Sequence, residues 1–423
     1  MSEAKLPENY CPYPFGHATT TPTGLWKLCC SSAEAEGFKT EYKGKFVFPV
    51  SSTSLKDYWD SGYMKWVREK HKSAEPISEC AACKKYEKQG AESYRQRAFK
   101  ELGILDEATH LPISLDLKLG NLCNASCLFC DPSSSSRILG EWKAMGFDKK
   151  TPFKTGLSGD VGPELFDLDF KWPQSQEFWK QIKEGSRALK SIKFTGGEPL
   201  INPFMIDYLE YLVEQDLAKN IRFQTTSNGI KIPPKFLELV GHFKEVEINF
   251  SVDGYSKQNE YIRFPTKWSS WLKNIENVEA TLDQDVSLYF QHSISVYSVF
   301  GLREYFEWMW PKKRFGFHLF KVFHPDFQQT ELLSVEEKNR VVNELDELHN
   351  DLRKLVDCER DEQLLAEING IKNFLTVQED KSHLKEELKK YIIELDRHRR
   401  ISIIDFMPKA AECLGITYDS YRS

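Results

Sequence analysis

The sequence predicts an α/β fold built on parallel strands, and three observations lead to it. Six short stretches rich in β-branched and aromatic residues follow residue 112, and helical stretches separate them. The first hundred residues are rich in loops and cysteine, whereas the last hundred are helical and strongly charged. Alternating strands and helices are typical of right-handed β-α-β units. Six units predict an open, partial (β/α)6 TIM-like barrel rather than a closed eightfold one.

Residues 1–108 are the predicted N-terminal domain. "CPYPFGHATTTPTGLWKLCC" is expected to form short strands around a turn at Thr23-Gly24, because glycine favours tight turns. Apolar residues at helical spacing predict a helical stretch over residues 54–73 and a second over residues 80–103.

Residues 109–328 are the predicted barrel. Its strands are expected in "ISLDLKL" and in residues 190–195, 220–227, 245–252, 286–294 and 315–322. Its helices are expected in residues 203–215, 233–243, 269–282 and 302–310. Residues 329–423 form a predicted helical C-terminal region, whose amphipathic helices are expected to pack on the barrel.

Composition limits the function classes. The net charge of −6 lacks the basic excess of a nucleic-acid binder, so a nucleic-acid partner is not expected. No apolar stretch follows a basic cluster near the start, and no run approaches the roughly 20 apolar residues that cross a bilayer. We therefore expect a soluble, cytoplasmic protein with no membrane partner.

Eight of the ten cysteines fall within the first 130 residues. In a reducing cytoplasm, clustered cysteines more often bind metal or carry out redox chemistry than form disulfides. Cys358 and Cys413 stand alone, and we interpret them as buried or incidental thiols.

Cys123, Cys127 and Cys130 have a spacing that packing does not explain. On a helix they would share one face, but the turn residues Gly120-Asn121 and Asp131-Pro132 flank them and predict a loop after a strand. Structural zinc requires four closed ligands, often in paired Cys-x-x-Cys units. Three thiolates instead suit a [4Fe–4S] cluster that leaves one iron open to a small molecule.

A Cys-x-x-x-Cys-x-x-Cys loop after the first barrel strand resembles the radical S-adenosylmethionine (SAM) superfamily. "FTGGEPL", residues 194–200, resembles the Gly-Gly-Glu-Pro motif of that superfamily. The resemblance implies that the three cysteines hold a SAM-binding [4Fe–4S] cluster and that Phe129 packs near the adenine. It also implies that Gly196, Gly197 and Glu198 contact the methionyl amino group, since glycine allows close backbone approach.

Further cofactor contacts are implied at the C-terminal ends of later strands, where βα barrels bind ligands. Ser227 in "TTSNG", with Ser251 and Asp253 in "SVDG", resembles the superfamily's ribose and carboxylate contacts. Such residues are also common helix caps. Arg263 in "EYIRF" is expected to pair with the SAM carboxylate, and a surface salt bridge is the alternative.

The N-terminal cysteines resemble the Cys-x(9–15)-Gly-x4-Cys element of SPASM and twitch domains, which hold auxiliary iron–sulfur clusters. Only one cysteine pair follows, so the twitch type fits better. The implied ligands are Cys11, Cys29, Cys80 and Cys83, with Cys30 as the alternate to Cys29. Four cysteines also suit zinc. Well-known twitch domains follow the barrel, whereas these cysteines precede it.

The whole chain resembles twitch-domain radical SAM proteins of bacteria and their phages, as far as "LDRHR" and "FMPKA" near its C-terminus. The resemblance implies an enzyme that receives an electron from a flavodoxin or ferredoxin and cleaves SAM reductively. The 5′-deoxyadenosyl radical then abstracts hydrogen from a substrate, while the auxiliary cluster accepts an electron or binds substrate.

The substrate is predicted to be a peptide or protein, with a small carbohydrate or nucleotide as the runner-up. A non-catalytic iron–sulfur or zinc protein that binds a partner is the alternative class. Beyond the clusters no catalytic residue is identified. Candidates at the edge of the barrel, each of which also fits a plain core, are Tyr255, Tyr261, Tyr297 and His292.

Overall fold

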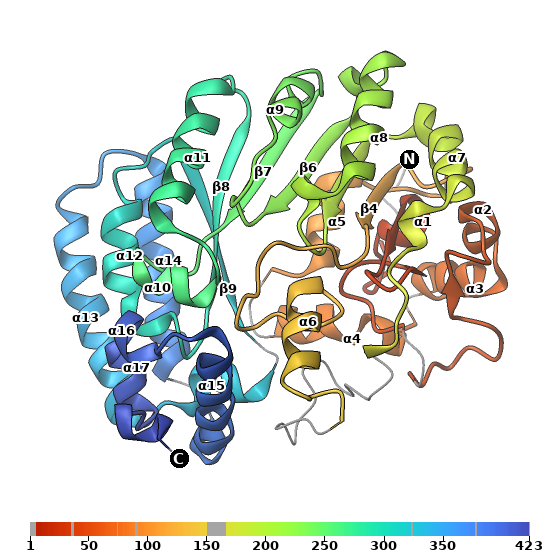
Figure 1. Ribbon diagram of the computed structural model, residues 1–423. Coiled ribbons are helices and arrows are strands. Elements are labelled where there is room, and N and C mark those ends of the chain that lie inside the picture. The colour runs from red at the N-terminus through yellow and green to blue at the C-terminus, as the bar shows by residue number, and fades with distance from the viewer. Residues whose placement is uncertain are drawn as a thin grey trace. The chain divides into compact units, whose positions relative to one another are not determined.

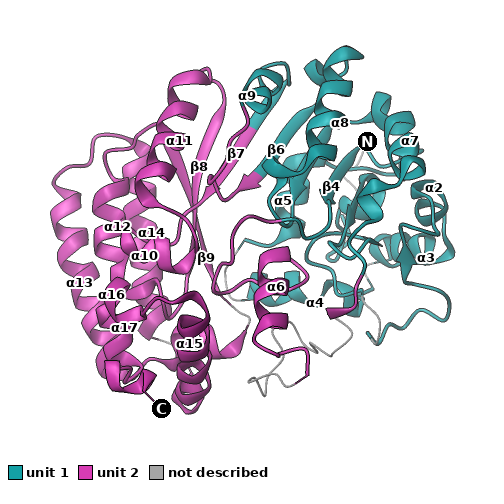
Figure 2. Cartoon of the chain, viewed as in Figure 1, with its two compact units in different colours: residues 1–122, 169–225, 234–246 teal, residues 123–168, 226–233, 247–423 magenta. Residues whose placement is uncertain are grey.

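The structure is a computed structural model of the 423-residue chain (Figure 1). It describes residues 6–34, 38–73, 75–88, 92–149, 166–322, 325–376 and 379–422. The chain forms two compact units (Figure 2): unit 1 comprises residues 1–122, 169–225 and 234–246, and unit 2 comprises residues 123–168, 226–233 and 247–423. The domain boundaries expected after residues 108 and 328 remain predictions.

Unit 1 contains strands in the order β3-β2-β1-β4-β5-β6. Their bounds are β1 (His17–Thr20), β2 (Leu25–Lys27), β3 (Phe48–Pro49), β4 (Ser114–Lys118), β5 (Ser191–Thr195) and β6 (Arg222–Ser227), whose last two residues belong to unit 2. β1, β4, β5 and β6 are parallel, whereas β2 and β3 pair antiparallel. The predicted turn at Thr23-Gly24 joins β1 to β2, and Gly24 adopts a φ of 81°, which glycine favours.

The two faces of the unit 1 strands differ in polarity. Phe194 and Phe223 lie on the apolar face, where their rings meet Tyr208 at 6.3 Å and Phe236 at 6.0 Å. On the other face, Asp116 of β4 lies opposite Lys193 of β5. Parallel strands are usually apolar on both faces. The polar face therefore fits a surface that meets solvent or ligand rather than a second layer of helices.

Six described helices of unit 1 follow the predicted stretches, two of which are split, whereas α1 lies where a short strand was expected and α7 was not predicted. Residues 54–73 form two helices, because Ser61 interrupts the stretch and its hydroxyl accepts from the backbone N–H of Met64 at 3.2 Å. Residues 80–103 also form two, the second of which begins with a capping box at Ser93. The bounds are α1 (Tyr13–Gly16), α2 (Leu55–Trp59), α3 (Gly62–Lys72), α4 (Ala81–Lys88), α5 (Tyr94–Leu102), α7 (Gln176–Gly185), α8 (Pro203–Glu214) and α9 (Pro234–Val240).

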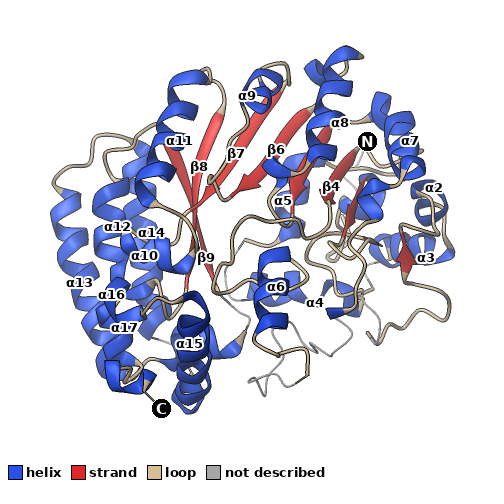
Figure 3. Ribbon diagram, in the orientation of Figure 1, coloured by secondary structure: helices blue, strands red, loops and turns tan. Residues whose placement is uncertain are grey.

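Unit 2 contains three parallel strands in the order β7-β8-β9 (Figure 3). They are β7 (Glu245–Ser251), whose first two residues belong to unit 1, β8 (Ser287–Ile294) and β9 (Phe315–Lys321). The helices are α6 (Ser136–Ala144), α10 (Lys257–Ile262), α11 (Trp268–Thr281), α12 (Leu302–Met309), α13 (Val335–Arg353), α14 (Glu359–Thr376), α15 (Lys385–Arg399), α16 (Ile403–Phe406) and α17 (Pro408–Cys413). Phe290 of β8 packs against Trp271 of α11 and Trp308 of α12.

These elements confirm the predicted α/β class, with parallel strands and a helical C-terminal part. All six predicted strands are present as β4 to β9, and β1 is a further parallel strand that the sequence pattern did not reveal. None of the described helices combines the length and apolar character needed to cross a bilayer.

Candidate active site

Cys123, Cys127 and Cys130 lie on one loop between β4 and α6, as the flanking turn residues predict. We call residues 123–130 the cysteine loop. Cys127 is buried, and the other two cysteines are half-buried. The backbone N–H of Cys130 donates to the carbonyl of Cys127 at 3.1 Å, and a hydrogen bond also links their thiols. The loop thus brings its thiols together without a helix.

The cysteine loop favours a thiolate at Cys127. A hydrogen bond from the Cys130 thiol lowers the pKa of Cys127 to about 7, and the Arg263 charge acts in the same direction against the effect of burial. The same hydrogen bond raises the pKa of Cys130. Thiolates, not thiols, bind metals. Of this pair, Cys127 therefore loses its proton more readily than Cys130.

Arg263 is buried against the cysteine loop. Its Nη1 lies 3.7 Å from the Cys127 sulfur, and its Nε lies 2.5 Å from an Asp253 carboxylate oxygen. Its guanidinium lies 5.7 Å from the ring centroid of Phe129. Burial acts to lower the pKa of Arg263, but Asp253 and Cys127 together raise it. The guanidinium is therefore a permanent cation beside the loop.

Asp253 is fixed from two sides in the described part of unit 2. Its backbone N–H donates to the Asn259 side chain at 2.9 Å, and its carboxylate accepts from the backbone N–H of Ser293 at 2.6 Å. Ser251 is buried at the end of β7. The hydroxyl of Ser227 accepts from the backbone N–H of Gly229 at 3.0 Å, which is a turn contact of the capping kind.

Asn228 is a site residue that sequence reasoning missed. Its Nδ2 lies 2.7 Å from Asn124 Oδ1 and 3.9 Å from the Cys123 sulfur. It follows Ser227 directly in "TTSNG", so the motif identified this turn, although the sequence analysis named only Ser227 in it. Asn228 therefore orients the start of the cysteine loop.

The backbone of the cysteine loop is held by several elements of unit 2. The N–H groups of Ser126 and Leu128 donate to carbonyls at the end of α10, at 2.6 and 2.9 Å. The carbonyl of Ser126 accepts from Arg399 of α15 at 2.7 Å, and Arg399 also pairs with Glu141 of α6 at 2.7 Å. Gln328 donates to the carbonyl of Leu128 at 2.9 Å. Arg399 belongs to "LDRHR", whose role no sequence spacing revealed.

The Gly-Gly-Glu motif lies in unit 1 against the residues that lead into the cysteine loop. Gly196 and Gly197 have φ values of 74° and 57°. A Cβ atom on Gly197 would lie 2.5 Å from the carbonyl oxygen of Leu122. The backbone N–H of Glu198 donates to the same oxygen at 2.8 Å, and its buried carboxylate accepts from Leu200 N–H at 3.1 Å.

Three of the four residues named above as catalytic candidates at the barrel edge lie in the protein core. The Tyr261 hydroxyl donates to Asp396 at 2.6 Å, and Tyr297 is fully buried. Burial lowers the pKa of His292 to about 4, and its Nδ1 lies 3.1 Å from a backbone carbonyl. Tyr255 is the exposed member of the four. Their catalytic roles stay predictions.

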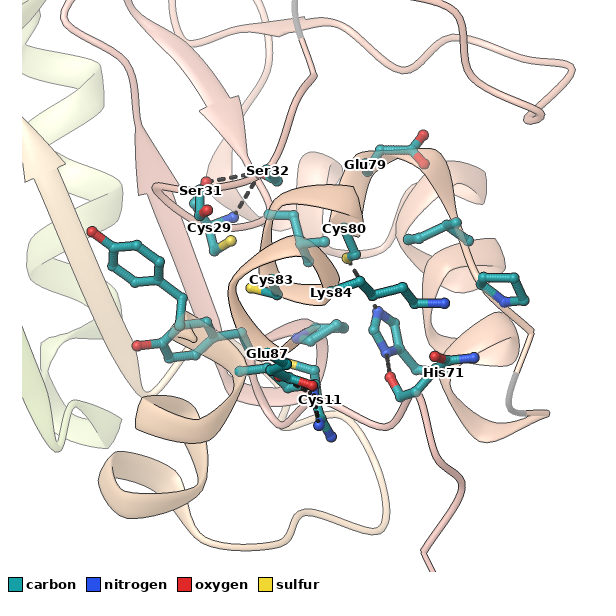
Figure 4. A pocket seen from close by; sticks show the side chains of 18 of the residues that line it. Cys11, Cys29, Ser31, Ser32, His71, Glu79, Cys80, Cys83, Lys84 and Glu87 are labelled. Carbon is teal, nitrogen blue, oxygen red and sulfur yellow. Dashed lines mark hydrogen bonds and ion pairs between the residues drawn. The ribbon is translucent and has the colours of Figure 1, made fainter. Parts of the chain in front are cut away.

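The N-terminal cysteines line one cavity of about 550 Å³ in unit 1. Figure 4 shows the side chains of Cys11, Cys29, Cys80 and Cys83 around this space. They come from the start of the chain, the segment after β2, the residue directly before α4 and the first turn of α4. Cys30 does not line the cavity. The four predicted ligands therefore lie around one cavity, and the alternate ligand Cys30 is not among the residues that line it.

Burial and mutual repulsion raise the pKa values of three thiols in this cavity, those of Cys11, Cys29 and Cys80. For Cys11 and Cys80, burial is the largest cause, followed by the charge that a neighbouring cysteine would carry. Cys29 shows the same direction, with Cys30 and Cys80 as charge neighbours. Such thiols ionise readily only when a cation enters, which is the behaviour of a metal site.

The two remaining cysteines do not form comparable sites. Cys358 is exposed, which agrees with an incidental rather than a buried thiol, and Cys413 is half-buried. Asp357 and Asp361 lie beside Cys358. Both carboxylates already pair with Lys313, which occupies the position that a metal ion would take.

Comparison with known proteins finds a family match for the middle part of the chain. Residues 117–289 match the radical SAM superfamily. The sporulation killing factor maturation protein SkfB of Bacillus subtilis (strain 168) is 25% identical over 169 residues, which are 38% of this chain and 33% of SkfB. The mycofactocin maturase MftC of Mycobacterium ulcerans (strain Agy99) is 25% identical over 170 residues, 40% of this chain and 37% of MftC. The match thus spans little more than a third of these relatives.

Among solved structures, native anSMEcpe with bound AdoMet is similar with a TM-score of 0.38 and 15% identity, over 57% of this chain and 62% of that one. The residues that match the superfamily include the cysteine loop, the Gly-Gly-Glu motif and Arg263. The chain therefore carries a radical SAM superfamily domain over residues 117–289.

Proposed function

We propose that the protein is a radical SAM enzyme and that Cys123, Cys127 and Cys130 hold its SAM-binding [4Fe–4S] cluster. The observation that carries this is a single loop with three cysteines, in which a hydrogen bond links the Cys127 and Cys130 thiols and lowers the pKa of Cys127 to about 7, inside the radical SAM domain. When bound and reduced, such a cluster supplies the electron that splits SAM into methionine and a 5′-deoxyadenosyl radical. The residues of this chain bind, orient and shield the reactants.

Gly197 gives the backbone its close approach to Leu122, and so fixes the residue before Cys123, whereas Gly196 lies against Lys118 of β4. Arg263 packs against the cysteine loop, where it faces the ring of Phe129 and the sulfur of Cys127. Glu198, Ser227, Ser251 and Asp253 remain the proposed SAM contacts, as the superfamily resemblance implies.

Arg263 has a second proposed role besides the predicted contact with the SAM carboxylate. Its Nε is engaged by buried Asp253, and its Nη1 faces Cys127. Both contacts support a positioning role, in which a permanent cation stabilises the Cys127 thiolate and holds the loop. Contact with the SAM carboxylate would then use the remaining nitrogen of the guanidinium.

We propose an auxiliary iron–sulfur cluster at Cys11, Cys29, Cys80 and Cys83. Sulfurs bound to a single tetrahedral zinc lie about 3.8 Å apart, as Zn–S bonds of about 2.3 Å require. Within the described residues, no three donor atoms of this set lie within 4.8 Å of one another. A cubane binds each cysteine through a different iron, and the wider spacing supports it over zinc.

The proposed substrate is a peptide or protein. The names of SkfB and MftC denote maturation proteins, which supports a precursor molecule as substrate. A small carbohydrate or nucleotide is the second candidate. The proposed electron donor is a flavodoxin or ferredoxin, and the proposed location is the cytoplasm.

The test of the SAM cluster is Cys127→Ala, assayed for 5′-deoxyadenosine after anaerobic reconstitution and reduction with dithionite. We expect the variant to form no product, and the matched control Cys358→Ala, an exposed cysteine, to retain wild-type product formation. Persistent 5′-deoxyadenosine in Cys127→Ala would contradict the cluster assignment. A filled, reducible cluster that gives no product in the wild type would favour a non-catalytic partner-binding protein.

The test of the auxiliary centre compares Cys29→Ala with Cys30→Ala. Cys29 lines the cavity and Cys30 does not. We expect Cys29→Ala to lose auxiliary metal, measured as iron and zinc per chain, and Cys30→Ala to retain it. The reverse pattern would make Cys30 the ligand, and an unchanged metal content in both would exclude this pair.

A further inference from the structure

The cavity with the four cysteines holds one imidazole that belongs to no predicted ligand set. His71, near the end of α3, is 4% exposed and lines the cavity together with the four thiols. Its Nε2 lies 3.8 Å from the sulfur of Cys80, and Figure 4 shows the ring beside that thiol. The cavity therefore presents five donors, one more than a cubane or a zinc ion requires.

The hydrogen bond on the far side of the ring fixes its tautomer. Nδ1 lies 2.7 Å from the carbonyl oxygen of Asn9, and a carbonyl oxygen can only accept. Nδ1 therefore carries the proton of the neutral ring, and Nε2 keeps a lone pair directed at Cys80. Metal-binding histidines have this arrangement: a carbonyl holds one nitrogen and the other is free to ligate.

The Cys80 thiol can donate a hydrogen bond to the lone pair of His71 Nε2 only while the thiol keeps its proton. Once Cys80 becomes a thiolate ligand, it has no proton to donate, and two lone pairs would face each other. A metal atom between them removes the repulsion. On one metal atom, a nitrogen at about 2.0 Å and a sulfur at about 2.3 Å lie about 3.0–3.5 Å apart at bond angles of about 90–110°. The observed 3.8 Å is close to this separation.

We propose that His71 ligates the auxiliary metal centre through Nε2, at the same metal atom that Cys80 faces. This rests on the proposed auxiliary centre. In an iron–sulfur cluster, the iron that binds Cys80 and His71 beside its three bridging sulfides is then five-coordinate, whereas on a tetrahedral zinc ion His71 takes the place of one of the four sulfurs. Nitrogen ligation of an iron–sulfur cluster raises its reduction potential.

The experiment uses the full chain with Cys123, Cys127 and Cys130 all replaced by alanine, so that only the auxiliary centre remains. After anaerobic reconstitution and reduction, pulsed EPR without SAM should show a strongly coupled nitrogen. That coupling should change on labelling histidine with ¹⁵N and disappear in the added His71→Gln variant. The control His110→Gln removes an exposed histidine and should leave it unchanged. If the centre holds zinc, X-ray absorption at the zinc edge replaces EPR and should show one nitrogen neighbour.

A second set of variants guards against a loss of folding in His71→Gln. Cys80→Ala alone should retain its auxiliary metal because His71 holds the same position, whereas Cys80→Ala with His71→Ala should lose it. A filled centre without a nitrogen coupling, or a coupling that survives His71→Gln, overturns the role of His71 alone. A centre that takes up neither iron nor zinc overturns the auxiliary centre itself and this inference with it.

Discussion

At Gly197 the backbone leaves no room for a side chain. Its φ of 57° is left-handed, and an added Cβ would lie 2.5 Å from the carbonyl oxygen of Leu122. That oxygen also accepts from Glu198, and Leu122 directly precedes Cys123. A side chain at this position would therefore displace the start of the cysteine loop.

Gly197→Ala should consequently destabilise the protein and weaken SAM binding. We expect its unfolding free energy to fall by about 1–3 kcal/mol more than that of the control Gly103→Ala. Gly103 also has a positive φ, of 67°, but no atom lies within 4 Å of its Cβ position. Urea unfolding and SAM titration of both variants provide the measurement. Equal effects in the two variants would mean that backbone strain alone matters.

The ion pair of Arg263 and Asp253 is buried, with side chains 10% and 0% exposed. Arg263→Ala would leave the Asp253 carboxylate buried without its partner. We expect the unfolding free energy to fall by about 3–5 kcal/mol in urea, and SAM affinity to fall with it.

The matched control for Arg263 is Arg303→Ala. Arg303 pairs with Glu307 and Glu347, whose side chains are 50% and 75% exposed. Exposed pairs contribute under about 1 kcal/mol. A similar loss in both variants would contradict the importance of burial, and unaltered SAM affinity in Arg263→Ala would contradict any role at the SAM site.

Among single residues, the sequence predicted those that form a distinctive motif with a fixed spacing. The cysteine triplet and the glycines fall into that class. Asn228, Arg399 and His71 do not, because an ordinary polar residue acquires its role only from the chain that folds against it. For example, no residue spacing in the sequence predicts that Arg399 donates a hydrogen bond to the carbonyl of Ser126.

Among the elements, α15 shows that the C-terminal helices do more than cover unit 2. Its Arg399 joins the carbonyl of Ser126 in the cysteine loop to Glu141 of α6. Its Asp396 accepts from the hydroxyls of Tyr261 and Tyr421, both at 2.6 Å. The helix thereby restrains the loop that presents the thiols.

Arg399→Ala should therefore lower iron retention and the rate of 5′-deoxyadenosine formation, because the loop loses a buried hydrogen bond and Glu141 loses its partner. The control is Arg397→Ala on the same helix. Arg397 is exposed and contacts only a backbone carbonyl, so we expect wild-type values from it. Iron content after desalting and the EPR line shape of the reduced cluster test the difference. Normal retention in Arg399→Ala would contradict the role of α15.

Helix and strand positions were largely predictable, since amphipathic spacing and β-branched runs recur through residues 190–400. The split of residues 54–73 at Ser61 was not, because a serine N-cap inside an apolar pattern is visible only when its hydroxyl is seen to bond to Met64. The parallel pairing of β1 with β4 was also missed. This pairing joins segments about 100 residues apart, and β1 has only four residues, too few to show a clear alternation of apolar and polar side chains.

Across the whole molecule, two sets of cysteines serve two proposed centres, one in each unit. The alternation of strands and helices predicted the α/β class because the pattern is repeated six times. The cavity in unit 1 was predictable in its cysteines but not in its histidine, since the pattern that revealed it is a cysteine pattern. The substrate stays a proposal at this scale as well, because the relatives match only about 40% of the chain.

The most direct measurement reconstitutes the wild-type protein anaerobically with iron and sulfide, counts iron, and assays 5′-deoxyadenosine from SAM under dithionite. We predict about eight irons per chain, as two cubanes require, together with product. About four irons with product would retain the enzyme and point to zinc at the N-terminal cysteines. A filled and reducible cluster that neither binds SAM nor yields 5′-deoxyadenosine would contradict the proposal that this protein is a radical SAM enzyme.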